Sequence, residues 1–228
     1  MKKILIAGYE AQTLNYQNAF SLLGALPCSL CGAPGQLVQK TSESPHSLVQ
    51  NYDGLVLPGG GDISPALFGE TNQGSRNIDE PLDLLQLDLL HAFASAGKPV
   101  LGICKGIQII NAGFGGKIIQ NLNPASLSVH AWDEQDRIHT TKAACGTFPF
   151  RLYGSRPIVN SAHHQAVGAL GAGLRVAQYA HDFVVEALYH ENLPILGVQW
   201  HPERMCFSHA RRDTEDGALL LKYFLSLL

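Results

Sequence analysis

The chain lacks the charge and the long apolar stretches that mark several large protein classes. Lysine, arginine, aspartate and glutamate make up only 15% of its 228 residues, the net charge is −3, and no basic run exceeds two residues. A protein that binds a phosphate backbone needs a cationic surface, so we expect no nucleic-acid partner. No apolar run approaches the roughly 20 residues of a membrane-spanning helix, and Met1–Tyr9 is too short for a signal sequence. We therefore expect a cytoplasmic protein with no membrane partner.

The cysteines form neither a disulfide nor a zinc pattern. There are five, an odd number, and a chain with 46% hydrophobic residues can build a core without covalent links. Cys28 and Cys31 have the spacing of half a zinc site, but no second pair follows, and a structural zinc ion needs four ligands. His163 and His164 belong to no HxH or HExxH pattern. We expect free thiols, no cofactor and no metal site.

Short apolar runs alternate with helical patterns along the chain. Apolar runs bounded by glycine, proline or charge are typical of strands buried in a parallel sheet. The predicted strands are 3–7, 28–30, 54–57, 100–103, 158–160, 174–178, 184–188 and 195–199. Apolar residues at spacings of three and four predict helices. These are 11–23, 81–96, 105–112 and 213–228. The alternation predicts one doubly wound α/β domain.

Two segments carry weaker signals. The stretch 32–46 is rich in glycine, proline and serine and is predicted to be a connection. Between 123 and 154 no clear periodicity is present, and we expect a β-rich excursion with loops there.

The sharpest local signal is Gly102-Ile103-Cys104-Lys105-Gly106, which joins a predicted strand to a predicted helix. A nucleophile on a tight strand-to-helix turn needs small residues on both sides, because larger side chains would collide across the turn. The turn also brings the sulfur to a helix N-terminus, where backbone N–H groups favour the thiolate. An isolated cysteine at a strand end is usually structural, but this setting predicts that Cys104 is a nucleophile.

A base for this thiol is predicted at His201-Pro202-Glu203. The triplet follows the predicted strand 195–199, and parallel strands of one sheet end on the same side. Pro202 fixes a backbone angle between two residues that can face one way. A carboxylate could then accept the imidazole Nδ1–H while Nε2 faces the thiol. Read alone, the triplet is an ordinary turn, so the prediction depends on Cys104.

A glycine-rich turn, Pro58-Gly59-Gly60-Gly61, ends another predicted strand. Glycine lets backbone N–H groups approach a ligand closely. One such donor together with the N–H of Lys105 would make an oxyanion hole.

The sequence resembles the class I glutamine amidotransferase superfamily, and within it the gamma-glutamyl hydrolase branch, peptidase family C26. Four stretches and Tyr16 carry the resemblance. The stretches are Leu57-Pro-Gly-Gly-Gly-Asp-Ile, Pro99-Val-Leu-Gly-Ile-Cys-Lys-Gly, Val159-Asn-Ser-Ala-His-His-Gln-Ala-Val and Gly197-Val-Gln-Trp-His-Pro-Glu. The resemblance implies a single domain over 1–228, with a flavodoxin-like, mostly parallel sheet and an antiparallel β excursion. It also implies no cofactor.

The resemblance assigns roles to individual residues. Cys104 would be the nucleophile, His201 the base and Glu203 its orienting carboxylate, with Gly60 and Lys105 as oxyanion donors. Three further residues would hold the glutamyl end of a small-molecule gamma-glutamyl substrate: Gln108, His164 and Gln165.

Some positions depart from the family pattern. Lys105 replaces a usual arginine, and Phe183 replaces a usual glycine, which we expect to change a turn and the pocket rim. Three function classes stay open. They are a free-standing gamma-glutamyl hydrolase, the glutaminase component of an amidotransferase with a separate synthetase partner, and a non-catalytic member of the fold. The sequence also leaves a homodimer open.

Overall fold

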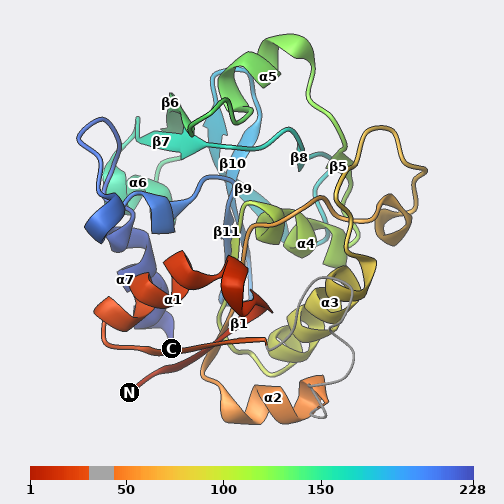
Figure 1. Cartoon of the computed structure of the whole chain (residues 1–228), viewed down its shortest axis with the longest axis vertical. Helices are drawn as coiled ribbons and strands as arrows, with labels where there is room; N and C mark the ends of the chain where they lie inside the picture. The colour runs from red at the N-terminus through yellow and green to blue at the C-terminus, as the bar shows by residue number, and fades with distance from the viewer. Residues whose placement is uncertain (31–43) are drawn as a thin grey trace.

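A nine-stranded sheet runs through the protein, which we describe from a computed structural model covering residues 1–30 and 44–228 (Figure 1). The strand order is β2-β1-β3-β4-β11-β10-β9-β6-β7, and the first five strands are parallel. These five are β2 (Leu26–Leu30), β1 (Lys3–Tyr9), β3 (Gly54–Leu57), β4 (Val100–Ile103) and β11 (Ile195–Val198). Their order is the flavodoxin-like 2-1-3-4-5 arrangement, as expected.

The remaining strands continue the sheet in antiparallel fashion. They are β10 (Val185–His190), β9 (Leu174–Ala180), β6 (Arg137–Ala143) and β7 (Ile158–Ser161). A separate two-stranded ladder joins β5 (Ile118–Ile119) to β8 (Ala166–Val167). The antiparallel excursion predicted from the second half of the chain is therefore present.

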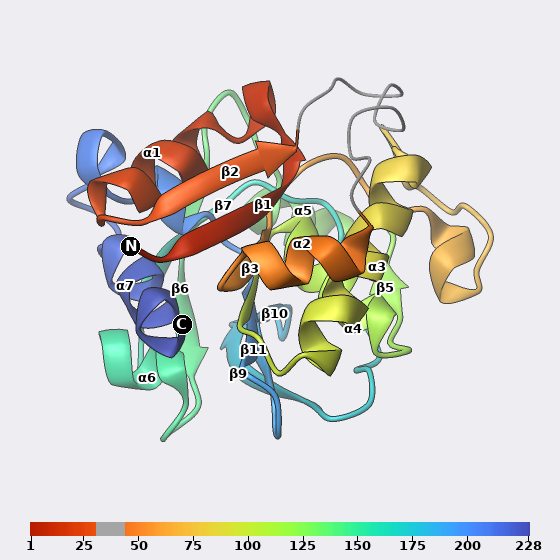
Figure 2. The same cartoon turned by 90° about the horizontal axis from the view of Figure 1, so that it is seen from below.

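Helices cover both faces of the sheet (Figure 2). One face carries α1 (Leu14–Leu22), α6 (Phe148–Tyr153) and α7 (Ala218–Leu227). The other carries α2 (Pro45–Asn51), α3 (Glu80–Ser95) and α4 (Lys105–Gly113). A further helix, α5 (Pro124–His130), lies near the antiparallel strands, and four 3-10 turns complete the described structure. The turns are η1 (Glu10–Gln12), η3 (Pro65–Phe68), η4 (Pro202–Arg204) and η5 (Phe207–His209).

Alternating residues of the parallel strands pack into two separate hydrophobic cores, one on each face of the sheet. In β1, Leu5 and Ala7 pack with α2, α3 and α4, whereas Ile4 and Ile6 pack with α1 and α7. Successive side chains of a strand point to opposite faces, so a strand that is apolar throughout is buried on both sides. This explains why these strands appear in the sequence as short continuous apolar runs.

Two sequence predictions were wrong in part. The segment 123–154 holds one strand, β6, and two short helices, α5 and α6. Asn123 caps α5 by accepting the N–H groups of Ala125 and Ser126, and Pro124 begins the helix, which is cap chemistry with a local signal. The closing helix begins at Ala218 instead of residue 213. The predicted connection 32–46 lies mostly outside the described residues, and α2 begins where it ends.

Among residues 1–30 and 44–228, no helix combines the length and the apolar character needed to cross a bilayer. Within the same ranges Cys28, Cys104, Cys145 and Cys206 are free thiols, as expected. Cys31 lies outside the described residues.

Candidate active site

Cys104 sits on a strained turn between β4 and α4. Its backbone has φ 54° and ψ −104°, which side-chain-bearing residues rarely adopt. A Cβ atom added at Gly102 would lie 2.5 Å from the backbone of Gly106, and one added at Gly106 would collide with the Leu57 carbonyl. Both flanking glycines are therefore required by close packing of the backbone, as the sequence pattern predicts.

His201 and Glu203 lie beside this turn because β11 is the parallel neighbour of β4. Val198 pairs with Ile103, and the Cys104 N–H donates to the Val198 carbonyl at 2.9 Å. The His201 Nδ1 and Glu203 Oε1 atoms are 2.7 Å apart, and each residue is only 2% exposed. The Cys104 side chain lies beside the His201 imidazole, because a Cβ atom added at Gly59 would be within 3.4 Å of both. The structure thus brings the three predicted side chains together.

Asn160 holds the His201 backbone in place, which the sequence did not reveal. Its Oδ1 accepts the His201 N–H at 2.8 Å, and its Nδ2 donates to the His201 carbonyl at 3.2 Å. Asn160 lies in the third of the four resemblance stretches, which was the available signal. These two hydrogen bonds join β7 to the chain after β11 and hold the His201 backbone in position.

The charges of this group stabilise one another. Burial by itself would lower the pKa of His201, but the negative charges of Glu203 and Cys104 outweigh it and raise the pKa to about 10. Burial would raise the pKa of Glu203, but the positive charge of His201 lowers it instead. An ionised carboxylate therefore faces a positively charged imidazole, an arrangement that can orient a base and hold a proton for transfer.

The glycine turn after β3 faces the thiol and the imidazole. The Gly59 N–H donates to the Tyr16 hydroxyl at 3.0 Å. A Cβ at Gly59 would lie 2.9 Å from His201 Cε1 and 3.4 Å from Cys104 Cβ, so any side chain there would fill the space between them. In the described part of the chain no acceptor is recorded for the Gly60 N–H. Lys105 is the first residue of α4, so its N–H lacks a partner within the helix.

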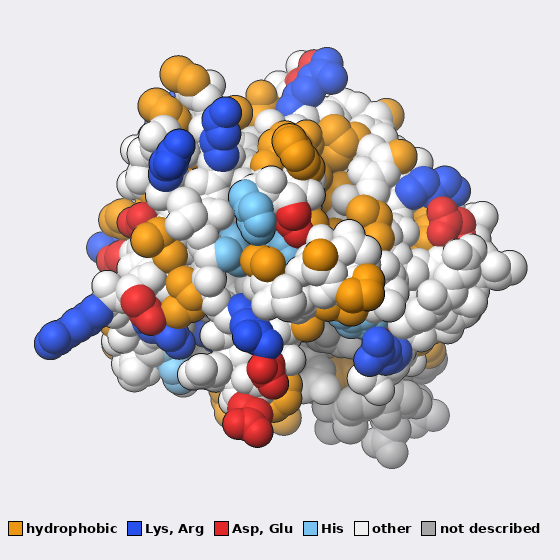
Figure 3. All heavy atoms as spheres, turned by 90° about the horizontal axis from the view of Figure 1, so that it is seen from above, with side chains coloured by type: hydrophobic (Ala, Val, Ile, Leu, Met, Phe, Trp, Pro, Cys, Tyr) orange, Lys and Arg blue, Asp and Glu red, His pale blue; other side chains and the backbone are white. Residues whose placement is uncertain are grey.

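A cavity of about 400 Å³ opens in front of Cys104. From above, Figure 3 shows histidine side chains gathered in a hollow of this surface. The lining includes every predicted substrate-binding residue and both predicted oxyanion donors: Gly60, Lys105, Gln108, His164 and Gln165.

The three predicted substrate-binding residues are held differently. Gln108 is buried, and its Nε2 donates to Gln199 Oε1 at 3.3 Å. His164 is partly exposed, with Nε2 2.8 Å from Asp62 Oδ2. Gln165 is buried, and its Nε2 donates to Ser75 Oγ at 2.7 Å and to the Gln120 carbonyl at 3.0 Å. These two hydrogen bonds hold the Gln165 side chain in place within the cavity wall.

Two further lining residues have no role in the sequence predictions. Trp132 is 61% exposed and lines the cavity, whereas Trp200 is fully buried. Arg76 also lines the cavity, from the segment between η3 and α3. Phe183 has φ 66° and is 83% exposed, but it is not among the lining residues. The positive φ at Phe183 is one that glycine adopts readily, and the expected effect on the pocket rim is not seen.

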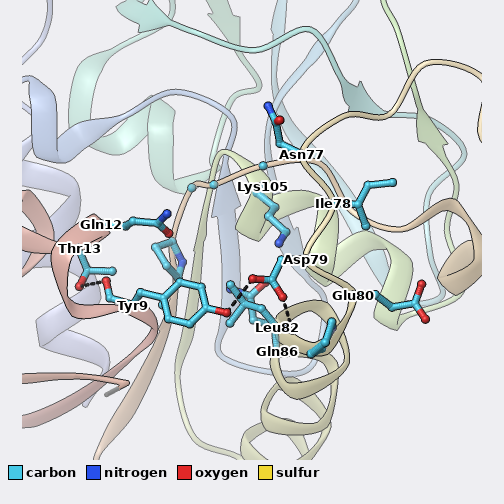
Figure 4. A pocket seen from close by; sticks show the side chains of 16 residues that line it. Tyr9, Gln12, Thr13, Asn77, Ile78, Asp79, Glu80, Leu82, Gln86 and Lys105 are labelled. Carbon is cyan, nitrogen blue, oxygen red and sulfur yellow. Dashed lines mark hydrogen bonds between the residues drawn. The ribbon is translucent and has the colours of Figure 1, made fainter. Parts of the chain in front are cut away.

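A second cavity of about 590 Å³ lies along the same glycine turn and shares Gly60, Gly61 and Lys105 with the first (Figure 4). Lys105 extends from α4 toward the acidic wall of this cavity, and its Nζ pairs with the buried Asp83 carboxylate. None of Cys104, His201 and Glu203 lines it. Lys105 therefore lines both cavities, and its side chain is held by the ion pair with Asp83.

Comparisons with known proteins agree with this geometry. A protein-family model described as Peptidase C26 matches residues 11–203. YvdE of Lactococcus lactis, named as glutamine amidotransferase-like, is 34% identical over 168 residues, covering 68% of this chain and 69% of that protein. The gamma-glutamyl-gamma-aminobutyrate hydrolase PuuD of Escherichia coli K12 is 31% identical over 215 residues, covering 87% and 81%.

Solved structures agree on the fold. A glutamine amidotransferase from Thermotoga maritima superposes with a TM-score of 0.63 at 16% identity, covering 89% of this chain and 76% of that one. The glutaminase domain of Trypanosoma brucei CTPS, with bound acivicin, superposes with a TM-score of 0.65 at 13% identity, covering 99% and 94%. At these identities the similarity shows the fold alone.

Proposed function

We propose that this chain, which belongs to the Peptidase C26 family of hydrolases, hydrolyses a gamma-glutamyl amide with Cys104 as its nucleophile. The observation that carries the proposal is the buried 2.7 Å pair between His201 and Glu203 beside a cysteine on a strained turn. A structural cysteine has no need of a rare backbone conformation, whereas a nucleophile held on a tight turn between a strand and a helix does.

Acylation follows from the positions of these groups. The Cys104 thiolate attacks the gamma-carbonyl carbon, and the oxyanion accepts hydrogen bonds from the Gly60 and Lys105 N–H groups. When the tetrahedral intermediate collapses, the C–N bond breaks and the His201 imidazolium gives its proton to the departing amine. A gamma-glutamyl thioester and a neutral imidazole remain. Glu203 keeps the imidazole oriented, with Nδ1–H toward the carboxylate.

Deacylation reverses the proton movement. A water molecule loses a proton to His201 Nε2 and attacks the thioester carbonyl. The C–S bond breaks, and the new gamma-carboxylic acid loses its proton to solvent as glutamate leaves. The thiolate and the imidazolium are restored, so no cofactor, oxidant or reductant is consumed.

Substrate recognition is assigned to the 400 Å³ cavity, whose size lies within the range of small-molecule sites. The glutamyl end carries an ammonium and a carboxylate. Gln108 and His164 provide polar atoms on the wall, and Gln165 supports it. Arg76 and Trp132 are placed on the amine side in this proposal, and the name of the E. coli relative supports a small amine such as gamma-aminobutyrate.

A substrate panel with no added partner tests the proposal. Gamma-glutamyl anilide or gamma-glutamyl-gamma-aminobutyrate should be turned over, and the alpha-linked anilide should be inert because its scissile carbonyl lies two carbons closer to the ammonium. Cys104→Ala should abolish turnover, whereas Cys145→Ala, an exposed thiol, should retain it. Hydrolysis of glutamine alone, and only after a second protein is added, would instead identify a glutaminase component.

The roles of the other two residues separate in kinetics. His201→Ala removes the base and should lower kcat by about 10²–10⁴-fold. Glu203→Gln keeps the fold and should cause a smaller loss, because it disturbs orientation and charge. A kinetically silent Glu203→Gln would mean that another residue orients the imidazole.

A further inference from the structure

Four buried polar side chains gather behind the cavity wall, outside the catalytic group. They come from separate elements: His130 from the end of α5, His139 from β6, His163 from the chain after β7, and Glu186 from β10. All four are buried. The His130 ring lies 4.6 Å from the His139 ring and 4.9 Å from the His163 ring, centroid to centroid. The reaction derived above uses none of them.

Glu186 is the centre of this group. Its Oε1 lies 3.0 Å from His139 Nε2, 3.4 Å from His130 Nδ1 and 4.0 Å from His163 Nε2. Two ligand atoms of one tetrahedral zinc ion, each 2.0–2.2 Å from the metal, are separated by about 3.4 Å. The ligand atoms of His130, His163 and Glu186 all lie within 4.8 Å of one another. Small side-chain movements would bring these three to metal-ligand distance.

His163 presents a lone pair to this centre. Its Nδ1 lies 2.8 Å from the Gln165 carbonyl oxygen, which can only accept, so Nδ1 carries the proton. With the proton on Nδ1, Nε2 is free to present its lone pair to the centre of the group. Within the described part of the chain, neither His163 Nε2 nor Glu186 Oε2 has a hydrogen-bond partner.

His130 is oriented in the same way. Its Nε2 lies 3.2 Å from both oxygens of Asp182, a carboxylate that can accept a hydrogen bond from the Nε2–H. With the ring proton on Nε2, the Nδ1 lone pair faces Glu186. Ser161 Oγ, 3.3 Å away, cannot supply a proton because it donates to the His130 carbonyl. Two imidazole lone pairs and a carboxylate thus converge on one point.

We propose that His130, His163 and Glu186 bind a divalent first-row metal ion, with Zn²⁺ as the best fit to two imidazoles and a carboxylate. Each histidine donates its other ring N–H to an oxygen acceptor, Asp182 or the Gln165 carbonyl, which is the usual outer support of a histidine ligand. A water molecule would complete the coordination in the fourth position, as at other zinc sites with three protein ligands.

His139 acts as a positioning residue at this site. Its Nε2 contacts the Glu186 oxygen, and its Nδ1 has no partner among the described residues. A ligand histidine would need an acceptor for that second nitrogen, so His139 serves better as a donor that orients Glu186. Its replacement should weaken metal binding by about 10–100-fold without abolishing it.

Metal titration of the chelator-treated protein, purified without a polyhistidine tag, tests the proposal. Cys104→Ala is used as the host because a thiolate would bind the same ions. One equivalent of Zn²⁺ should be retained through desalting and should raise the unfolding midpoint relative to chelator. One equivalent of Co²⁺ should give visible d–d bands without a thiolate charge-transfer band. His163→Gln or Glu186→Gln should abolish binding, whereas His91→Gln, at an exposed histidine on α3, should not.

The proposal is overturned if the host protein retains less than about a tenth of an equivalent of Zn²⁺ and shows no cobalt bands. The group would then be a hydrogen-bonded network with a charged histidine. It is equally overturned if folded His163→Gln and Glu186→Gln variants bind as tightly as the host. Because the host itself supplies stoichiometry and spectrum, a variant that fails to fold does not remove the test.

Discussion

Replacing Cys104 with glycine should inactivate the protein and stabilise it relative to Cys104→Ala. Cys104 has φ 54° and ψ −104°, a conformation that glycine adopts readily and alanine does not. Both variants lose the thiol and its charge interaction with His201. The difference between them therefore isolates the effect of the Cβ atom on the backbone.

The expected magnitude follows from two opposing effects. A residue with a Cβ in such a conformation is destabilised by about 1–3 kcal/mol. Glycine, in turn, loses more backbone entropy on folding, about 0.5–1 kcal/mol. We expect the free energy of unfolding of Cys104→Gly to exceed that of Cys104→Ala by about 1 kcal/mol. For a chain of 228 residues this corresponds to a rise in Tm of roughly 2–4 °C.

Urea denaturation and calorimetry of the two variants provide the measurement. The control is Ala92→Gly in the interior of α3, where the same atom is removed from an ordinary helical backbone and about 1 kcal/mol should be lost. The argument is supported if removal of the Cβ atom raises the free energy of unfolding at residue 104 and lowers it at residue 92. If Cys104→Gly is no more stable than Cys104→Ala, the turn stores no strain and the reasoning fails.

Three further predictions concern charge, backbone and pH. Lys105→Met should lower the free energy of unfolding, measured by urea denaturation, by about 3–5 kcal/mol, because it leaves the buried Asp83 carboxylate unpaired. Adding Asp83→Asn should recover most of this loss. If the effects of the two substitutions simply add, the explanation is wrong. Phe183→Gly should raise stability by about 1 kcal/mol by relieving a positive φ at a side chain exposed to solvent, and an unchanged midpoint would argue against strain. The folded-state pKa of His201 is raised to about 10, so its stabilising interaction with Glu203 is complete below the unfolded value of 6.5 and is lost as the pH rises toward 10. Stability measured between pH 6.5 and 9.5 should therefore fall more steeply in the wild type than in His201→Gln, and equal slopes would refute the assignment.

Local sequence patterns correctly predicted strands and helices whose apolar residues follow a clear pattern along the element itself. The strands at 54–57 and 100–103 are apolar throughout and match β3 and β4, and the periodic run at 81–96 matches α3 within a residue. The short helices α5 and α6 were missed because a helix of six or seven residues depends on its cap and on tertiary packing more than on periodicity.

The same distinction between local and long-range information applies to the candidate site. Cys104, His201 and Glu203 stand in contiguous motifs, so they could be named from sequence, and their catalytic roles remain predictions. The grouping of His130, His163 and Glu186 could not be found, because three separate elements supply it and no spacing connects them. Trp132 lines the cavity from the segment 123–154, whose predicted secondary structure was wrong in part.

The position of β11 between β4 and β10 also determines when Cys104 and His201 come together. Cys104 is synthesised long before His201, and the two meet only after β11 inserts into the middle of the sheet. Pairing over such a sequence separation is slow compared with local helix formation. A growing or partly refolded chain therefore carries a cysteine without its imidazole. Hydrolytic activity regained during refolding would then time the insertion of this strand, independently of the spectroscopic return of helices.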